Sequence, residues 1–118
     1  MHFIIITTQE DTIMTSDTTT VVKADETKII LKIHEQMAGD KYDGVSTTRT
    51  RIFTPTEMKC IDPPLADKDG YTSPYDWRNK GQTKTETAVY DFTAEKFAAL
   101  LAEIRKGNFD YFAFEYFD

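Results

Sequence analysis

The residues of this chain best suited to recognition lie in one irregular stretch, residues 62–82. Its aromatic and charged candidates for partner binding are Tyr71, Tyr75, Asp76, Trp77 and Arg78. Tyr, Trp and Arg are the residue types that dominate binding energy at protein interfaces. A disordered segment is usually poor in aromatics, so we expect this loop to be at least partly ordered. The alternative is that Trp77 folds back over the protein and anchors its own loop.

Two arginines offer a second kind of chemistry. Arg49 and Arg51 are two positions apart in a predicted strand, so their side chains share one face. Two guanidinium groups on a sheet face could bind an anion, or line a sheet-floored pocket for a small ligand together with the loop aromatics. Cross-strand ion pairs with Glu57, Glu86 or another acid are the alternative, and we favour it.

Motifs for catalysis or for metal binding do not stand out. His2 and His34 are far apart in the sequence, and for His34 we expect an exposed or hydrogen-bonded role. Neither GxGxxG nor GxxxxGK[ST] occurs, and spacing names no nucleophile–base pair. Cys60 is the single cysteine, which excludes an internal disulfide, and its surroundings predict a buried structural thiol. We therefore expect a protein without enzymatic activity, cofactor or metal.

Composition limits the remaining classes. A chain of 118 residues with 40% hydrophobic and 29% charged residues is typical of a single soluble domain, residues 1–118. The net charge of -6 counts against direct nucleic-acid binding. It fits an ordinary soluble protein, the alternative that we favour, or one whose partner has a basic, nucleic-acid-binding surface. No apolar run approaches membrane-spanning length and the N-terminus lacks a convincing secretory signal, so we expect a cytoplasmic location without membrane contact.

The C-terminal run, residues 109–117, is aromatic, free of proline and has high strand propensity. Its aromatic side chains fall on both faces of such a strand, so the strand is either buried on both sides or meets a partner. Tyr111 and Glu115 are the candidate partner contacts on it. An exposed aromatic edge could also pair with a second copy, so a homo-oligomer is possible.

Alternation and turn residues predict the other strands. We expect strands at residues 3–8, 20–24, 28–35, 45–53, 57–61 and 83–92. The polar turn at 25–27 makes the second and third of these a hairpin, in which Ile29, Leu31 and Ile33 point to the core. The polar residues Thr15 to Thr18 predict a linker or turn, so residues 1–18 could be a peripheral strand plus linker.

Residues 93–106 predict an amphipathic helix. Thr93 is a suitable N-cap, and Gly107 is suited to the left-handed position that ends a helix. The apolar residues that match a hydrophobic staple and one helical face are Phe92, Phe97, Leu100, Leu101 and Ile104. Together the elements predict an α+β fold: a mainly antiparallel sheet of five or six strands, this helix packed on it, and the terminal aromatic strand.

Residues 92–97 and 106–110 resemble the ending of a small actinobacterial domain family of unknown function. In both, Phe-Thr precedes a helix that leads into Gly-x-Phe-Asp. The N-terminal Trp-Arg-Lys-Ser-type motif of that family is missing here, and this chain continues past the point where the family ends. The resemblance implies a helix followed by a strand, and no particular function.

Small acidic chains without catalytic motifs are often binding proteins of mobile elements. We therefore expect a non-enzymatic protein-binding module, an inhibitor or immunity-type protein of a phage or mobile element that blocks a host protein (an anti-defence role). The alternatives are a self-assembling structural protein, or a small-ligand or nucleotide-binding domain.

Overall fold

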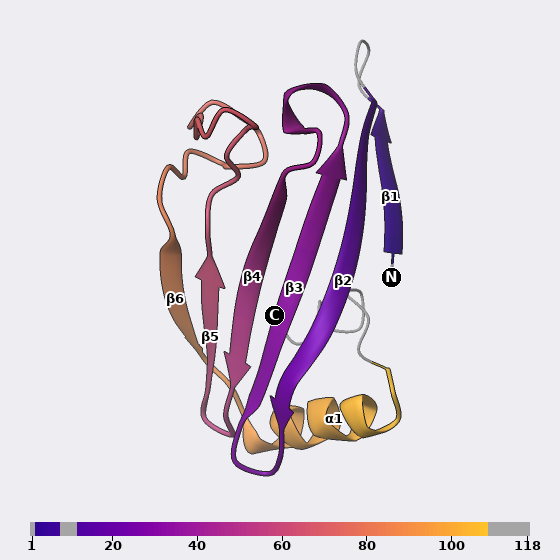
Figure 1. The fold of residues 1–118 in the computed structure, drawn as a ribbon. Helices are drawn as coiled ribbons and strands as arrows, with labels where there is room; N and C mark the ends of the chain where they lie inside the picture. The colour runs from indigo at the N-terminus through magenta and orange to yellow at the C-terminus, as the bar shows by residue number, and fades with distance from the viewer. Residues whose placement is uncertain (1, 8–11, 109–118) are drawn as a thin grey trace.

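The computed structural model describes residues 2–7 and 12–108, and for residues 2–7 and 12–15 it describes only the backbone. In this described part of the chain, six strands form one sheet in the order β1-β2-β3-β4-β5-β6, so each strand pairs with its neighbours along the chain (Figure 1). The strands are β1 (His2–Thr7), β2 (Thr12–Ala24), β3 (Ile29–Ala38), β4 (Ser46–Phe53), β5 (Glu57–Asp62) and β6 (Glu86–Asp91). A 3-10 turn, η1 (Asp40–Tyr42), joins β3 to β4, and α1 (Ala94–Arg105) follows β6. All pairs are antiparallel, which confirms the predicted α+β class.

The hairpin of β2 and β3 forms as predicted because Asp25 organises its turn. Asp25 Oδ1 accepts hydrogen bonds from the backbone N–H groups of Thr27 at 2.8 Å and Lys28 at 3.1 Å. This is the local side-chain pairing that makes aspartate a good turn residue. Leu31 and Ile33, which follow in β3, are 0% and 2% exposed, so the predicted core face is confirmed.

The predicted linker at Thr15 to Thr18 is wrong, because these residues lie inside β2. Ser16 pairs with Phe3 of β1 on one side and with Gln36 of β3 on the other. A strand with neighbours on both sides has its backbone groups paired within the sheet, so polar side chains do not end it. Residues 2–7 therefore form a strand at the edge of the described sheet, and residues 12–18 are the first part of the interior strand β2.

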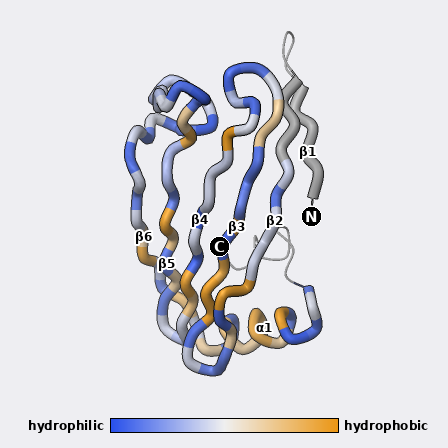
Figure 2. The backbone as a smooth tube through the Cα atoms, viewed as in Figure 1, coloured by the Kyte–Doolittle hydropathy of each residue, from blue (hydrophilic) through white to orange (hydrophobic). Residues whose placement is uncertain are grey.

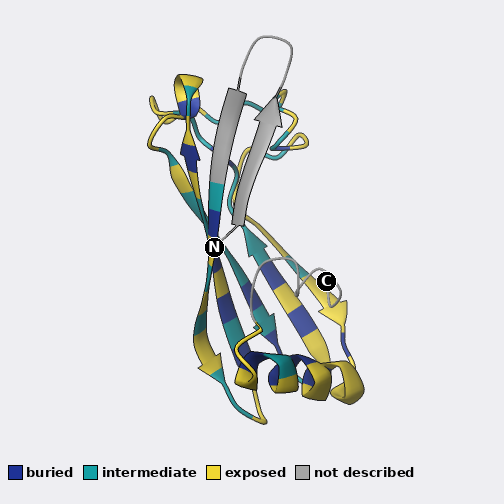
Figure 3. Cartoon of the chain, turned by 90° about the vertical axis from the view of Figure 1, so that its right-hand side faces the viewer, coloured by how far each residue is buried: buried dark blue, intermediate teal, exposed yellow. Residues whose placement is uncertain are grey.

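Helix α1 covers one end of one face of the sheet (Figure 3). Its N-cap is Thr93, whose Oγ1 accepts from the Lys96 N–H at 3.1 Å, and Gly107 beyond its C-terminus has φ 86°. Its four buried apolar residues are Phe97, Leu100, Leu101 and Ile104. They join a cluster with Ile29, Leu31, Phe53, Met58 and Phe92 from the sheet and its connections. Figure 2 shows apolar residues gathered at this end of the molecule. The predicted amphipathic helix is confirmed.

Three further predictions have different outcomes. The last described strand is shorter than the predicted range of 83–92, since β6 covers Glu86–Asp91. Cys60 is buried, as predicted for a structural thiol. The predicted terminal strand at 109–117, with Tyr111 and Glu115, lies outside the described residues.

A second, smaller apolar cluster lies at the other end of the sheet. Met37, Tyr42 and Leu65 are buried together, with Val45 packed against them. Met37 is four positions after Ile33 in β3, so both side chains belong to the same sheet face. One face of the sheet is thus covered at one end by α1 and at the other by the connection between β5 and β6.

Candidate functional site

Three side chains anchor the connection between β5 and β6. The carboxylate of Asp76 accepts hydrogen bonds from Arg78 Nε and Nη2, each at 3.0 Å, and from the Tyr42 hydroxyl. The Arg78 guanidinium carbon lies 3.9 Å from the centre of the Tyr42 ring, which adds a cation–π contact. The side chains of Asp76 and Arg78 are only 5% and 14% exposed. These residues hold the loop rather than present themselves to solvent.

The protonation states of this cluster are strongly biased. Burial acts to raise the pKa of Asp76, but the hydrogen bonds from Arg78 and Tyr42 outweigh burial and lower that pKa to about 2. Burial, and then the hydrogen bond to Asp76, raise the pKa of Tyr42 to about 12. At neutral pH the cluster therefore contains an ionised Asp76 and a neutral Tyr42 that donates to it.

Asn79 is the second anchor of the loop and is 2% exposed. Its Oδ1 accepts from the Leu65 N–H at 2.7 Å, and its Nδ2 donates to the carbonyl oxygens of Leu65 at 3.0 Å and Ser73 at 2.9 Å. Because both amide hydrogens and the oxygen have partners, this buried amide carries no unmet hydrogen bond. The loop is ordered in these residues, as its aromatic content predicted.

Three aromatic side chains of the same loop face solvent. Tyr71 is 62% exposed, Tyr75 94% and Trp77 56%. The structure thus divides the five predicted contact residues into an exposed aromatic set and the anchors Asp76 and Arg78. Trp77 has more than half of its surface exposed, so it does not close over the sheet as a buried lid.

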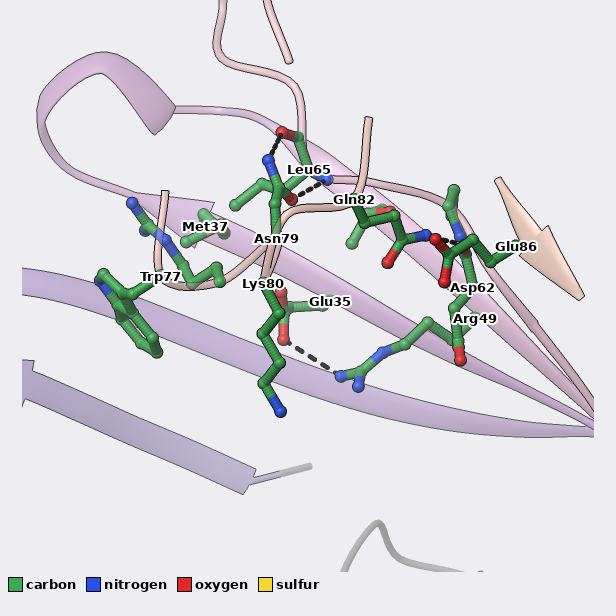
Figure 4. A pocket seen from close by; sticks show the side chains of 13 residues that line it. Glu35, Met37, Arg49, Asp62, Leu65, Trp77, Asn79, Lys80, Gln82 and Glu86 are labelled. Carbon is green, nitrogen blue, oxygen red and sulfur yellow. Dashed lines mark hydrogen bonds and ion pairs between the residues drawn. The ribbon is translucent and has the colours of Figure 1, made fainter. Parts of the chain in front are cut away.

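A pocket of about 470 Å³ opens between this loop and the sheet (Figure 4). Its floor is formed by side chains of β3 and β4, namely Glu35, Met37, Thr47 and Arg49. Its walls are formed by Asp62, Pro63, Leu65, Trp77, Arg78, Asn79, Lys80, Gln82 and Glu86. Burial raises the pKa of Glu35 while Arg49 opposes that shift, so the floor carries a desolvated ion pair.

The two arginines of β4 are each engaged by an acid. Arg49 Nη2 lies 3.4 Å from Glu35 Oε2, and Arg51 Nη1 lies 2.6 Å from Asp62 Oδ1. Ion pairing with an acid, the alternative that we favour from the sequence, is confirmed, and the acids are Glu35 and Asp62. Arg51 lines a different pocket, of about 540 Å³, so the two guanidinium groups do not face one cavity. An anion site that uses both stays a prediction, and these ion pairs count against it.

His34, metal binding and membrane spanning are the remaining points that the structure addresses. His34 Nδ1 lies 3.0 Å from Thr48 Oγ1, in keeping with the hydrogen-bonded role expected for it. Within the described part of the chain, no three His, Cys, Asp or Glu side chains lie close enough to hold a metal ion. None of the helices in residues 12–108 combines the length and apolarity needed to cross a membrane.

Tyr42, Asn79 and Lys80 are among the site residues that reasoning from the sequence missed. Tyr42 lies 34 positions from Asp76, so no local pattern connects them. Asn79 and Lys80 precede Gly81, and an Asn near a Gly is a turn signal that could have drawn attention to them.

We found no match to this chain among protein-family models, curated proteins or solved structures. Its function is therefore inferred from its own geometry.

Proposed function

We propose that this chain is a non-enzymatic protein-binding module that contacts its partner through the loop from Tyr71 to Arg78. The observation that carries this proposal is the exposure of Tyr71, Tyr75 and Trp77 on a loop that buried polar anchors hold in place. Aromatic side chains on an ordered loop bury a large area on binding and lose little conformational freedom. Both properties favour tight contact with a protein surface.

Charge suggests the kind of partner. The net charge of -6 favours a partner with a basic surface, such as one that binds nucleic acid, because opposite charges speed and orient association. The inhibitor or immunity-type role, in a phage or mobile element, is a prediction from composition, and the fold adds nothing to it.

The test is an affinity pull-down from a lysate of the source organism or its host, read by mass spectrometry. Wild type is compared with Tyr75→Ala and Trp77→Ala. Tyr90→Ala is the matched control, because Tyr90 is 54% exposed but lies on β6, outside the loop. We expect one dominant protein that is retained by Tyr90→Ala and lost or reduced with both loop variants.

Affinity for the captured protein then gives the magnitude. Each loop substitution should weaken binding by about 2 kcal/mol or more, roughly thirtyfold, with the fold unchanged by circular dichroism. Wild-type affinity in both variants would remove this loop from the binding site.

Self-assembly is a second candidate, favoured by β6, which pairs with β5 alone among the described strands. Val89 and Tyr90 on β6 are 56% and 54% exposed, and an uncovered apolar edge can pair with another chain. Sedimentation equilibrium at several concentrations would show a mass that rises with concentration if the edge pairs. A monomer at all concentrations would reject this candidate.

A further inference from the structure

Among the described residues that line the pocket beside Trp77, one cationic side chain forms no ion pair. Of the basic residues that line it, Arg78 is bound to Asp76 and Arg49 is bound to Glu35. The third, Lys80, is exposed and forms no ion pair with any described residue. Its ammonium group is therefore available to a ligand.

The backbone at Lys80 favours a different residue. Lys80 has φ 51° and Gly81 has φ 84°, and the Gln82 N–H donates to the Asn79 carbonyl oxygen at 2.8 Å. Positive φ at both central residues is the pattern of a type I′ turn, which favours Gly, Asn or Asp. A lysine at this position costs backbone energy that asparagine would largely avoid. Residues kept in costly backbone conformations cluster at functional sites, which directs attention to the Lys80 side chain.

The same pocket has a flat aromatic wall. Trp77, a residue that is more than half exposed, lines it, and Met37 and Leu65 add apolar surface. Figure 4 shows the Lys80 side chain extending into the space between Trp77 and the Arg49–Glu35 pair. Glu86 lies at the opposite side of the pocket in this view. The side of Trp77 and Lys80 is thus aromatic and cationic, the side of Glu86 is acidic, and the Arg49–Glu35 pair lies between them.

We propose that this pocket binds a planar anionic small molecule, a ring that carries a phosphate or a carboxylate. The ring stacks on the Trp77 indole and the anionic group contacts Lys80 Nζ. The pocket volume of about 470 Å³ is within the range of small-molecule sites. Glu86 disfavours a second anionic group at its end, because like charges repel. This site shares Trp77 with the proposed partner contact, but Tyr71 and Tyr75 of that contact do not line the pocket.

The chain reports on this site directly, because Trp77 is its single tryptophan. The indole N–H signal of the 15N-labelled protein is followed by NMR during titration with four probes: adenosine 5′-monophosphate, adenosine, indole-3-acetate and inorganic phosphate. We expect a saturable shift with the nucleotide or the aromatic carboxylate, and binding at least ~5-fold weaker for adenosine and for phosphate, because each lacks one of the two contacts. The nucleotide and carboxylate arms distinguish the two sources of the negative charge. Absence of a saturable shift with either, or equal binding of adenosine, would overturn the proposal.

A substitution that the backbone favours separates binding from folding. Lys80→Asn should keep or raise the unfolding temperature. It should weaken the affinity for the probe at least ~5-fold, because a charge-assisted contact is lost. Lys68→Asn is the matched control, because Lys68 is an exposed lysine of the same connection that does not line the pocket. Tyr75→Ala should leave probe binding unchanged, so a failure of the partner proposal and a failure of this one can be told apart. Unchanged probe affinity in Lys80→Asn would reject the assigned role of Lys80 and with it the proposal.

Discussion

The guanidinium carbon of Arg78 lies 3.9 Å from the centre of the Tyr42 ring. Asp76 joins the two residues, because its carboxylate accepts hydrogen bonds from both. This polar cluster therefore links the connection from β5 to β6 to the turn after β3, next to the small apolar cluster of Met37, Tyr42 and Leu65. A backbone hydrogen bond from the Lys68 N–H to the Lys41 carbonyl oxygen at 2.9 Å reinforces the same junction.

Removing the charge of Asp76 should destabilise this junction. Asp76→Asn leaves the Arg78 guanidinium, 14% exposed, without its counter-ion. We expect the free energy of unfolding to fall by about 2–3 kcal/mol at pH 7, because an unpaired buried charge is costly. Urea denaturation measures this change. The matched control is Asp69→Asn in an exposed turn, which should change stability by less than about 0.5 kcal/mol.

The stabilities of wild type and Asp76→Asn should respond differently to acid. The folded-state pKa of Asp76, about 2, is below its ordinary value, so its stabilisation is present above pH of about 4 and is lost as pH falls through about 2. The stability difference between wild type and Asp76→Asn should therefore shrink between these pH values. A difference that stayed constant down to pH 2 would contradict the lowered pKa.

Alkaline pH should weaken the cluster through Tyr42. Its folded-state pKa of about 12 is above the ordinary value of about 10, so its stabilisation is present below pH 10 and is lost as pH rises through 12. Tyr42→Phe cannot ionise and should lose less stability than wild type between pH 9 and 12. Thermal unfolding of both proteins across that range provides the measurement, and parallel decreases in melting temperature would argue against this assignment.

Asn79→Ala should loosen the loop while the main sheet stays folded. The substitution leaves the buried Leu65 N–H without its acceptor and frees the Ser73 carbonyl oxygen. We expect hydrogen exchange at the Leu65 amide to accelerate by at least tenfold, which corresponds to about 1.4 kcal/mol of lost protection. Amides of β3 should exchange as in wild type. Unchanged exchange at Leu65 would show that the loop does not depend on this side chain.

Shortening a central side chain of α1 should affect the whole fold. Leu100 is 0% exposed within the apolar cluster between α1 and the sheet. Leu100→Ala should reduce the free energy of unfolding by about 2–5 kcal/mol through lost burial and the cavity that remains. The control is Lys96→Ala, because Lys96 is an exposed residue of the same helix. Urea denaturation measures both variants, and similar losses of the free energy of unfolding would contradict a dominant role for this core.

Local features of this chain were determined by its sequence alone. The turn at Asp25, the N-cap at Thr93 and the alternation in β3 depend on residues only a few positions apart, so pattern and propensity are sufficient to predict them. The polar stretch from Thr15 to Thr18 was misjudged, because its strand conformation comes from pairing with β1 and β3 on either side. Propensity describes a segment in isolation, whereas the strand conformation of this segment depends on pairing with both β1 and β3.

Only the tertiary structure decided which side chains of the loop are anchors and which are exposed. The sequence places Asp76, Trp77 and Arg78 side by side, but their roles follow from Tyr42, which belongs to the turn between β3 and β4. In the same way Lys80 shares a pocket with Arg49 because β4 passes beneath the loop. Such contacts join distant parts of the chain, and their geometry is set by strand register and by the packing of the loop on Met37, Tyr42 and Leu65. No spacing along the sequence encodes that packing, so the sequence could name this loop as a candidate site but could not predict its arrangement.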